Sequence, residues 1–128
     1  MTSILLAFTL ATTAFDLPPG LLDAVCYVET KHTENAIHLN DGGSPSLGIC
    51  QIKLATAREL GYKGSAEDLQ YNTKVNAHYA AKYLSRNLRK YADINKSISA
   101  FNCGHYTPKN IRYVKRVNEA WRPKYAAY

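Results

Sequence analysis

Apolar residues at helical spacing run through the middle of the chain, and they are the feature that most restricts its fold. From residue 72 onward, apolar side chains recur every three or four positions, which is the periodicity of one helix face. Asn72 stands directly before this run, and Asn is a preferred N-cap residue. The pattern predicts a long helix with one face on a hydrophobic core, formed by Val75, Tyr79, Ala80, Tyr83, Leu84, Leu88 and Tyr91.

Shorter helices are predicted on both sides of this one. Pro18, Pro19 and Gly20 end any helix that precedes them. A new helix is predicted to begin near Gly20 and to continue to about residue 30. We expect short helices over 54–60, closed by Gly61, and over 97–102, ended by Gly104. A last helix is predicted after Asn110 and is stopped by Pro123, with Ile111, Val114, Val117 and Trp121 on its buried face.

Residues 40–45 read Asn-Asp-Gly-Gly-Ser-Pro, which is a strong turn cluster. Short apolar stretches at 37–39 and 47–49 flank it, so we expect a small β-hairpin or an ordered loop there. With 128 residues and no repeat or linker, the sequence predicts one compact, mainly α domain with this single β or irregular excursion.

The first fourteen residues have two interpretations. An uncharged apolar run from Ile4 to Ala11 ends in Thr12-Thr13-Ala14, small residues at which a signal peptidase cuts, but no Lys or Arg precedes the run. The run is also shorter than the ~20 residues of a stable membrane span. Residues 1–14 are therefore either a signal-like segment or the first helix, and residues 15–128 form the remaining domain.

Charge is divided unevenly along the chain, whose net charge is +6. Residues 1–80 carry five Lys/Arg against eight Asp/Glu, a net of −3, whereas residues 81–128 carry eleven against two, a net of +9. A basic half suggests an anionic partner: nucleic acid, a membrane surface or the cell wall. Because no homeodomain, zinc or RNA-recognition motif is present, nucleic acid is not expected.

Three cysteines, Cys26, Cys50 and Cys103, are an odd number without a CxxC motif or Cys/His spacing suited to zinc. Each lies beside apolar residues, so buried free thiols are the default expectation. One disulfide with a spare thiol is the alternative for an exported chain.

Glu29 occupies an unusual position in the helix that begins near Gly20. At about 100° per residue, Glu29 falls between Val25 and Cys26, in the middle of the apolar stripe. A carboxyl group there loses hydration, so its pKa is expected to rise, as a general acid requires. Alternatively, Glu29 ends the helix and turns outward, or pairs with a buried amide.

Two amides accompany this carboxyl group in the sequence. Gln51 follows Gly48, a residue that permits close approach of a ligand, and Asn102 precedes Gly104 at a predicted helix end. Each amide is able to hydrogen-bond the hydroxyl or acetamido group of a sugar. The plainer interpretation of either residue is a polar group satisfied within the fold.

Five motifs in order resemble the soluble lytic transglycosylase domain family, over about Leu17 to Trp121. They are Val28-Glu29-Thr30, Gly48-Ile49-Cys50-Gln51-Ile52, Asn76 before Tyr83-Leu84, Ala100-Phe101-Asn102-Cys103-Gly104 and Tyr113-Val114. The resemblance implies a lysozyme-like, mainly α (α+β) fold that cleaves peptidoglycan without a cofactor or metal. The family has a helix before its counterpart of Leu17, which favours residues 1–14 as a structural helix.

The resemblance also implies roles for individual residues. Glu29 matches the single catalytic glutamate, which protonates the glycosidic oxygen and then acts as base on the muramoyl C6 hydroxyl, giving a 1,6-anhydro ring. Thr30, Gln51, Asn102 and Tyr113 match residues that line the substrate. Two departures stand out: Phe101 replaces the usual Tyr, and Cys50 replaces the usual Met.

Two other functions remain as alternatives. A hydrolytic muramidase needs a second acidic group about 5–9.5 Å from the first, and Asp41 or Glu34 is the candidate in sequence. A non-catalytic wall-binding module would use the basic half alone.

We expect a monomer acting on peptidoglycan strands in the periplasm or cell envelope, reached by export or at lysis. Phage or conjugative wall opening and cellular wall remodelling both suit such an enzyme.

Overall fold

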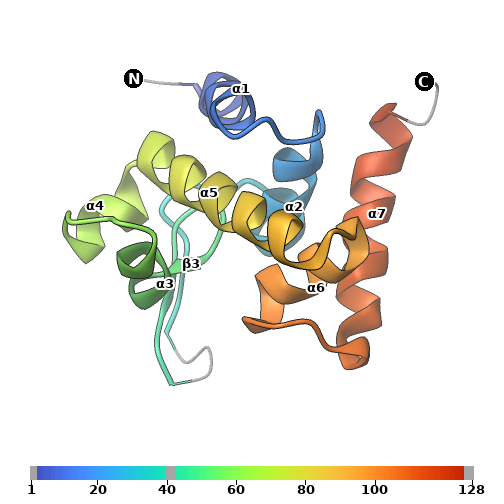
Figure 1. The fold of residues 1–128 in the computed structure, drawn as a ribbon. Coiled ribbons are helices and arrows are strands. Elements are labelled where there is room, and N and C mark those ends of the chain that lie inside the picture. Colours follow the sequence, from blue (N-terminus) through green and yellow to red (C-terminus); the bar gives the residue numbers. More distant parts are fainter. Residues whose placement is uncertain (1–2, 40–42, 126–128) are drawn as a thin grey trace.

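The computed structural model describes residues 3–39 and 43–125, and is mainly helical (Figure 1). The helices are α1 (Ile4–Ala14), α2 (Leu21–Thr30), α3 (Leu54–Glu59), α4 (Ala66–Tyr71), α5 (Thr73–Tyr91), α6 (Ile94–Cys103) and α7 (Ile111–Tyr125). A 3-10 turn, η1 (Pro108–Asn110), precedes α7. A small antiparallel sheet has the order β1 (Ile37–His38), β2 (Ser46–Leu47), β3 (Ile52–Lys53). The predicted mainly α fold with a β-hairpin is confirmed.

Helix α5 crosses the middle of the molecule (Figure 1), and its buried side chains form the centre of the hydrophobic core. Its N-cap is Asn72, whose side chain accepts a hydrogen bond from the Val75 amide at 3.2 Å, as predicted. The fully buried residues of α5 include a row of small ones, Ala77, Ala80 and Ala81. Small side chains let other helices approach closely, and α1, α2, α4 and α6 all pack on α5.

Helix α1 packs on α5 and lies above it in the view of Figure 1. Ser3 caps it, accepting a hydrogen bond from the Leu6 amide at 3.1 Å, and Ala7, Phe8 and Ala11 are buried against the core. Residues 4–14 therefore form a packed helix. Among the residues that the structure describes, no helix is both long enough and apolar enough to cross a membrane.

Helices α6 and α4 differ from the prediction. Helix α6 begins at Ile94, three residues before the predicted start, because Asp93 caps it by accepting a hydrogen bond from the Lys96 amide at 2.8 Å. Helix α4 was not predicted. Only Leu69 of its six residues is buried, so the sequence there has no apolar periodicity, and its local signals are the Ser65 cap and the acidic residues Glu67 and Asp68 in the first turn.

The last helix corrects three predictions. Pro123 does not stop α7, which runs through Tyr125, because packing of α7 on α2 and α6 outweighs the unfavourable helix propensity of proline. Ile111 is 71% exposed rather than buried, whereas Val117 is buried as predicted and Tyr113, which the predicted face omitted, is buried as well. The side chain of Asn110, the predicted cap, is engaged with α6 instead: its Oδ1 accepts from the Ser99 hydroxyl at 2.6 Å, and its Nδ2 donates to the Ser99 carbonyl at 3.1 Å.

The hairpin region agrees with the prediction and extends it. Strand β1 pairs with β2, with Ile37 opposite Leu47, and the unpredicted strand β3 pairs with the other edge of β2. Two-residue strands are too short to show alternation, so β3 had no sequence signal. Asp41, in the turn of the hairpin, lies outside the described residues.

The default expectation for the cysteines is wrong. Cys26 of α2 and Cys50 form a disulfide, and Cys103 is a free, exposed thiol at the end of α6. The pairing joins two fully buried residues that lie 24 positions apart in the chain. Apolar neighbours indicate burial but carry no information about which thiols meet, and so the alternative of one disulfide with a spare thiol is the arrangement found.

Candidate active site

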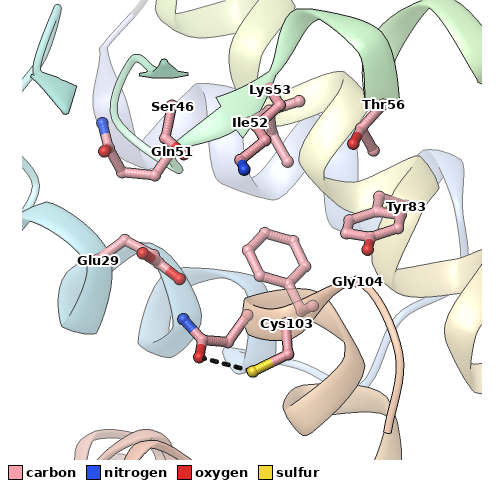
Figure 2. Close-up of a pocket in the computed structure, with 11 residues that line it drawn as sticks. Glu29, Ser46, Gln51, Ile52, Lys53, Thr56, Tyr83, Cys103 and Gly104 are labelled. Atoms are coloured by element: carbon pink, nitrogen blue, oxygen red, sulfur yellow. Dashed lines mark hydrogen bonds between the residues drawn. The ribbon is translucent and has the colours of Figure 1, made fainter. Parts of the chain in front are cut away.

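A cleft lies between the sheet with α3 on one side and the ends of α2 and α6 on the other (Figure 2). It brings together three of the five site residues that the sequence predicted: Glu29, Gln51 and Asn102. The remaining lining residues are Ser46, Ile52, Lys53, Thr56, Tyr83, Phe101, Cys103 and Gly104. A site assembled from both halves of the chain explains why its motifs are scattered in the sequence.

Glu29 stands in the last turn of α2, half-buried, with its carboxyl group directed into the cleft (Figure 2). Tyr113 of α7 donates a hydrogen bond from its Oη to Glu29 Oε2 at 2.6 Å. This arrangement differs from the alternative in which the Glu29 side chain turns outward. The carboxyl group is partly withdrawn from water and oriented by a neighbouring helix.

Tyr113 is suited to this task because it stays protonated. Its side chain is 6% exposed. Burial raises the pKa of the Tyr113 phenol well above its usual value, and the charge of Glu29 and the hydrogen bond to it raise that pKa further. Tyr113 is therefore a neutral hydrogen-bond donor to Glu29 at neutral pH. Tyr113 contacts Glu29 through this hydrogen bond and is not among the described residues that line the cleft.

The segment from Gly48 to Gln51 is shaped by Asn76 of α5. Asn76 is fully buried, donates to the carbonyl oxygens of Leu47 and Leu69 at 2.8 and 2.9 Å, and accepts from the Cys50 amide at 2.9 Å. Gly48 has a φ of 79°, and a Cβ there would collide with the Asn76 amide. The close approach predicted at Gly48 is thus to a side chain of the protein itself rather than to a ligand.

The same segment is held on α2 at two further points. The Thr30 hydroxyl donates to the Ile49 carbonyl at 2.7 Å, and the disulfide joins Cys26 to Cys50. Thr30 therefore lies next to the site, but it is not among the described lining residues, and its hydroxyl is engaged within the fold. Both links join the helix that carries Glu29 to the loop that carries Gln51.

The two amides line the cleft in different ways. Gln51 has a φ of 57°, and its Nε2 donates to the Gly48 and Ala36 carbonyls at 2.9 and 3.3 Å, so part of this side chain stabilises the turn. Asn102 is exposed at the end of α6, and its Oδ1 accepts from the Cys103 thiol at 3.4 Å (Figure 2). Both amide side chains line the same cleft as the Glu29 carboxyl group.

Comparison with known proteins agrees with this geometry. The family model described as the transglycosylase SLT domain matches residues 7–122. The chain belongs to the transglycosylase SLT domain family. It is 30% identical over 111 residues to protein IpgF of Shigella flexneri, covering 84% of this chain and 72% of the relative. IpgF of Shigella sonnei matches equally, and the X polypeptide of Escherichia coli is 26% identical over 118 residues, covering 90% and 70%. No solved structure gives a significant match.

Membership in the SLT family assigns the chain a lysozyme-like fold and a function of the lytic-transglycosylase type on peptidoglycan. Against the family pattern, Phe101 lacks the usual hydroxyl. It is buried with its ring 5.3 Å from the ring of Tyr83, and Tyr83 donates its own hydroxyl to the Ala100 carbonyl at 3.1 Å. The aromatic wall of the cleft is retained without the missing oxygen.

Several lining residues escaped the sequence analysis, including Ser46, Lys53, Thr56 and Cys103. Lys53 had the clearest overlooked signal, since it directly follows the Gln51-Ile52 motif. Ser46 and Thr56 are ordinary polar residues whose types indicate no particular chemistry. Among the described residues, no group of three or more His, Cys, Asp or Glu side chains is arranged to hold a metal ion.

Proposed function

We propose that the protein is a peptidoglycan lytic transglycosylase that cleaves the β-1,4 bond between N-acetylmuramic acid and N-acetylglucosamine. Glu29, as the carboxylic acid, gives its proton to the glycosidic oxygen, and the bond from that oxygen to muramoyl C1 breaks. Glu29, now a carboxylate, takes the proton of the C6 hydroxyl as O6 bonds to C1. The products are a 1,6-anhydromuramoyl end and a free C4 hydroxyl, with no water consumed.

The observation that carries this proposal is the single carboxyl group held in the cleft by Tyr113. Of the described residues that line the cleft, Glu29 alone has a carboxyl group. The bond from Tyr113 to Oε2 fixes the orientation of the carboxyl group in the cleft. One oriented carboxyl group is sufficient for a reaction whose nucleophile comes from the substrate itself.

A hydrolytic muramidase has less support. Glu34, one of its two candidate second carboxylates, accepts a hydrogen bond from the Thr73 hydroxyl at 2.6 Å and is not among the described cleft residues. Asp41 lies outside the described residues. The lyase reaction requires neither group.

We further propose that Gln51 and Asn102 hydrogen-bond the sugar, and that Thr30 positions the Gln51 loop. The partner is the peptidoglycan strand, attracted by the +9 charge of residues 81–128. A disulfide between Cys26 and Cys50 persists in an oxidising compartment, which supports a place in the periplasm or cell envelope, and we expect the protein to act as a monomer.

The test is a comparison of Glu29→Gln with Glu34→Gln in a wall-clearing assay on purified peptidoglycan. Both changes keep size and remove one charge. Glu29→Gln should lose at least ~10²-fold in rate, because general acid–base catalysis contributes about that much or more. Glu34→Gln should clear walls at close to the wild-type rate. Circular dichroism checks that both variants fold, and wall clearing by a folded Glu29→Gln protein at the wild-type rate would refute the proposal.

A further inference from the structure

A lysine ammonium group projects into the catalytic cleft from the wall opposite α6. Lys53 is half-buried, and its side chain extends from β3 into the space that Glu29 faces (Figure 2). Among the described lining residues it is the one Lys or Arg side chain, and it belongs to the mildly acidic half of the chain rather than to the basic half.

The backbone of Lys53 is held firmly. Lys53 pairs with Ser46 across the β2–β3 ladder, and it is also the N-cap residue of α3. As the N-cap residue, Lys53 contributes through its backbone, because a lysine ammonium group cannot accept a hydrogen bond from a helix amide. Because Lys53 lies on a strand next to a helix start, the position from which its charged side chain extends is fixed, which favours a role in recognition.

The chemistry of the glycan indicates what such a group recognises. Hydroxyl and acetamido groups are neutral, and in peptidoglycan carboxylates are carried by the muramic acid residue. That residue bears a lactyl ether on C3, on the same ring whose C1 is attacked. The lactyl carboxyl group is free when the stem peptide has been removed, and otherwise leads to the carboxylates of the stem peptide.

We propose that Lys53 is a specificity-determining residue that binds a carboxylate carried by the C3 substituent of muramic acid. The inference rests on the proposed function, since it places that sugar in the cleft. Lys53 pairs with the anionic substituent while Glu29 acts at C1 of the same ring. Glycans without that carboxylate lose a charge-assisted hydrogen bond in a partly desolvated site, and so bind more weakly.

The experiment measures binding, so that its outcome is independent of the chemical step. The Glu29→Gln protein is titrated calorimetrically with three soluble muroglycan oligomers: one with free lactyl carboxylates, one with stem peptides, and one whose lactyl groups are methylamides. We expect tighter binding, roughly 10-fold or more, of an oligomer that carries the recognised carboxylate than of the methylamide, because hydrogen bonds to charged groups have about this strength. The oligomer that gains affinity identifies the lactyl or the stem carboxylate as the source.

Adding Lys53→Met to the Glu29→Gln protein should remove this preference, Lys53→Arg should retain most of it, and added salt should weaken it. Lys63→Met is the matched control, because it removes the same charge from an exposed position outside the described cleft lining. Equal preference with and without Lys53, or no preference in the Glu29→Gln protein, would overturn the inference.

Kinetics with Glu29 intact separate this role from an effect on Glu29 itself. Lys53→Met should raise KM for the carboxylate oligomer and leave kcat nearly unchanged, whereas a loss of kcat on all three oligomers would contradict substrate binding by Lys53. If the wild-type protein forms no anhydro product from oligomers that it binds with the expected preference, the proposed function fails while carboxylate recognition stands.

Discussion

The hydroxyl of Tyr113 donates to Glu29 Oε2 at 2.6 Å, and this bond joins two residues 84 positions apart in the chain. It connects the last helix to the helix that carries the candidate acid, and it needs α7 to pack on α2 as observed. Because the phenol is buried and its pKa is raised well above the usual value, it orients the carboxyl group as a permanent neutral donor.

Tyr113→Phe is expected to reduce kcat on soluble muroglycans roughly 10–100-fold, because one hydrogen bond to a charged group contributes about 1.5–3 kcal/mol. The ring is retained, so the fold should survive. Tyr106→Phe is the control, since Tyr106 is 40% exposed and outside the described cleft lining. Equal activity of the two variants would show that the Tyr113 hydroxyl does not orient Glu29.

Gly48→Ala is expected to destabilise the protein more than Gly43→Ala. Both glycines have positive φ, 79° and 91°, which costs other residues about 1–2 kcal/mol. Only at Gly48 does the added Cβ meet the Asn76 amide, whereas at Gly43 nothing lies within 4 Å. Overpacking adds about 1–3 kcal/mol, so urea unfolding should separate the variants by that amount. Equal losses would mean that Asn76 does not pack against this turn.

The sequence predicted the structure best where a helix has one apolar face. Asn72 and the apolar stripe after it predicted α5, and the position of Glu29 between Val25 and Cys26 predicted a carboxyl group held against the core. Both are local properties of a helix, which the 3.6-residue period makes readable.

Features that depend on contacts between distant segments could not be predicted in the same way. The Cys26–Cys50 pairing and the burial of Asn76 under Gly48 arise only after α2, α5 and the sheet have packed together. Thr30 shows the same limit, because the family resemblance implied substrate contact, whereas its hydroxyl engages the Ile49 carbonyl. Resemblance to a family supplied the roles that local patterns could not.

Replacing both Cys26 and Cys50 by Ala should lower the free energy of unfolding by about 3–4 kcal/mol, the chain-entropy value for a loop of this length. Cys103→Ser should change the free energy of unfolding little, because this thiol is exposed and forms no disulfide. Urea unfolding with and without reductant checks both statements. A wild-type protein whose stability is insensitive to reductant would contradict the disulfide.

Phe8→Ala should destabilise the protein by about 3–5 kcal/mol, because Phe8 is buried where α1 packs on the core. Leu5→Ala, on the same helix, should stay within about 0.5 kcal/mol, because Leu5 is 72% exposed. Thermal unfolding of the two variants compares them directly. Equal small effects would indicate that residues 1–14 do not contribute to the folded domain, and would favour a signal-like segment.

The central claim is that Glu29 performs a lyase reaction in which the substrate supplies its own nucleophile. Its most direct test is digestion of purified peptidoglycan in ¹⁸O-labelled water, followed by mass spectrometry of the new muramoyl ends. The account predicts 1,6-anhydro ends without ¹⁸O, formed by the wild-type protein and not by Glu29→Gln. Reducing ends that are one water heavier and carry ¹⁸O would contradict it and show hydrolysis.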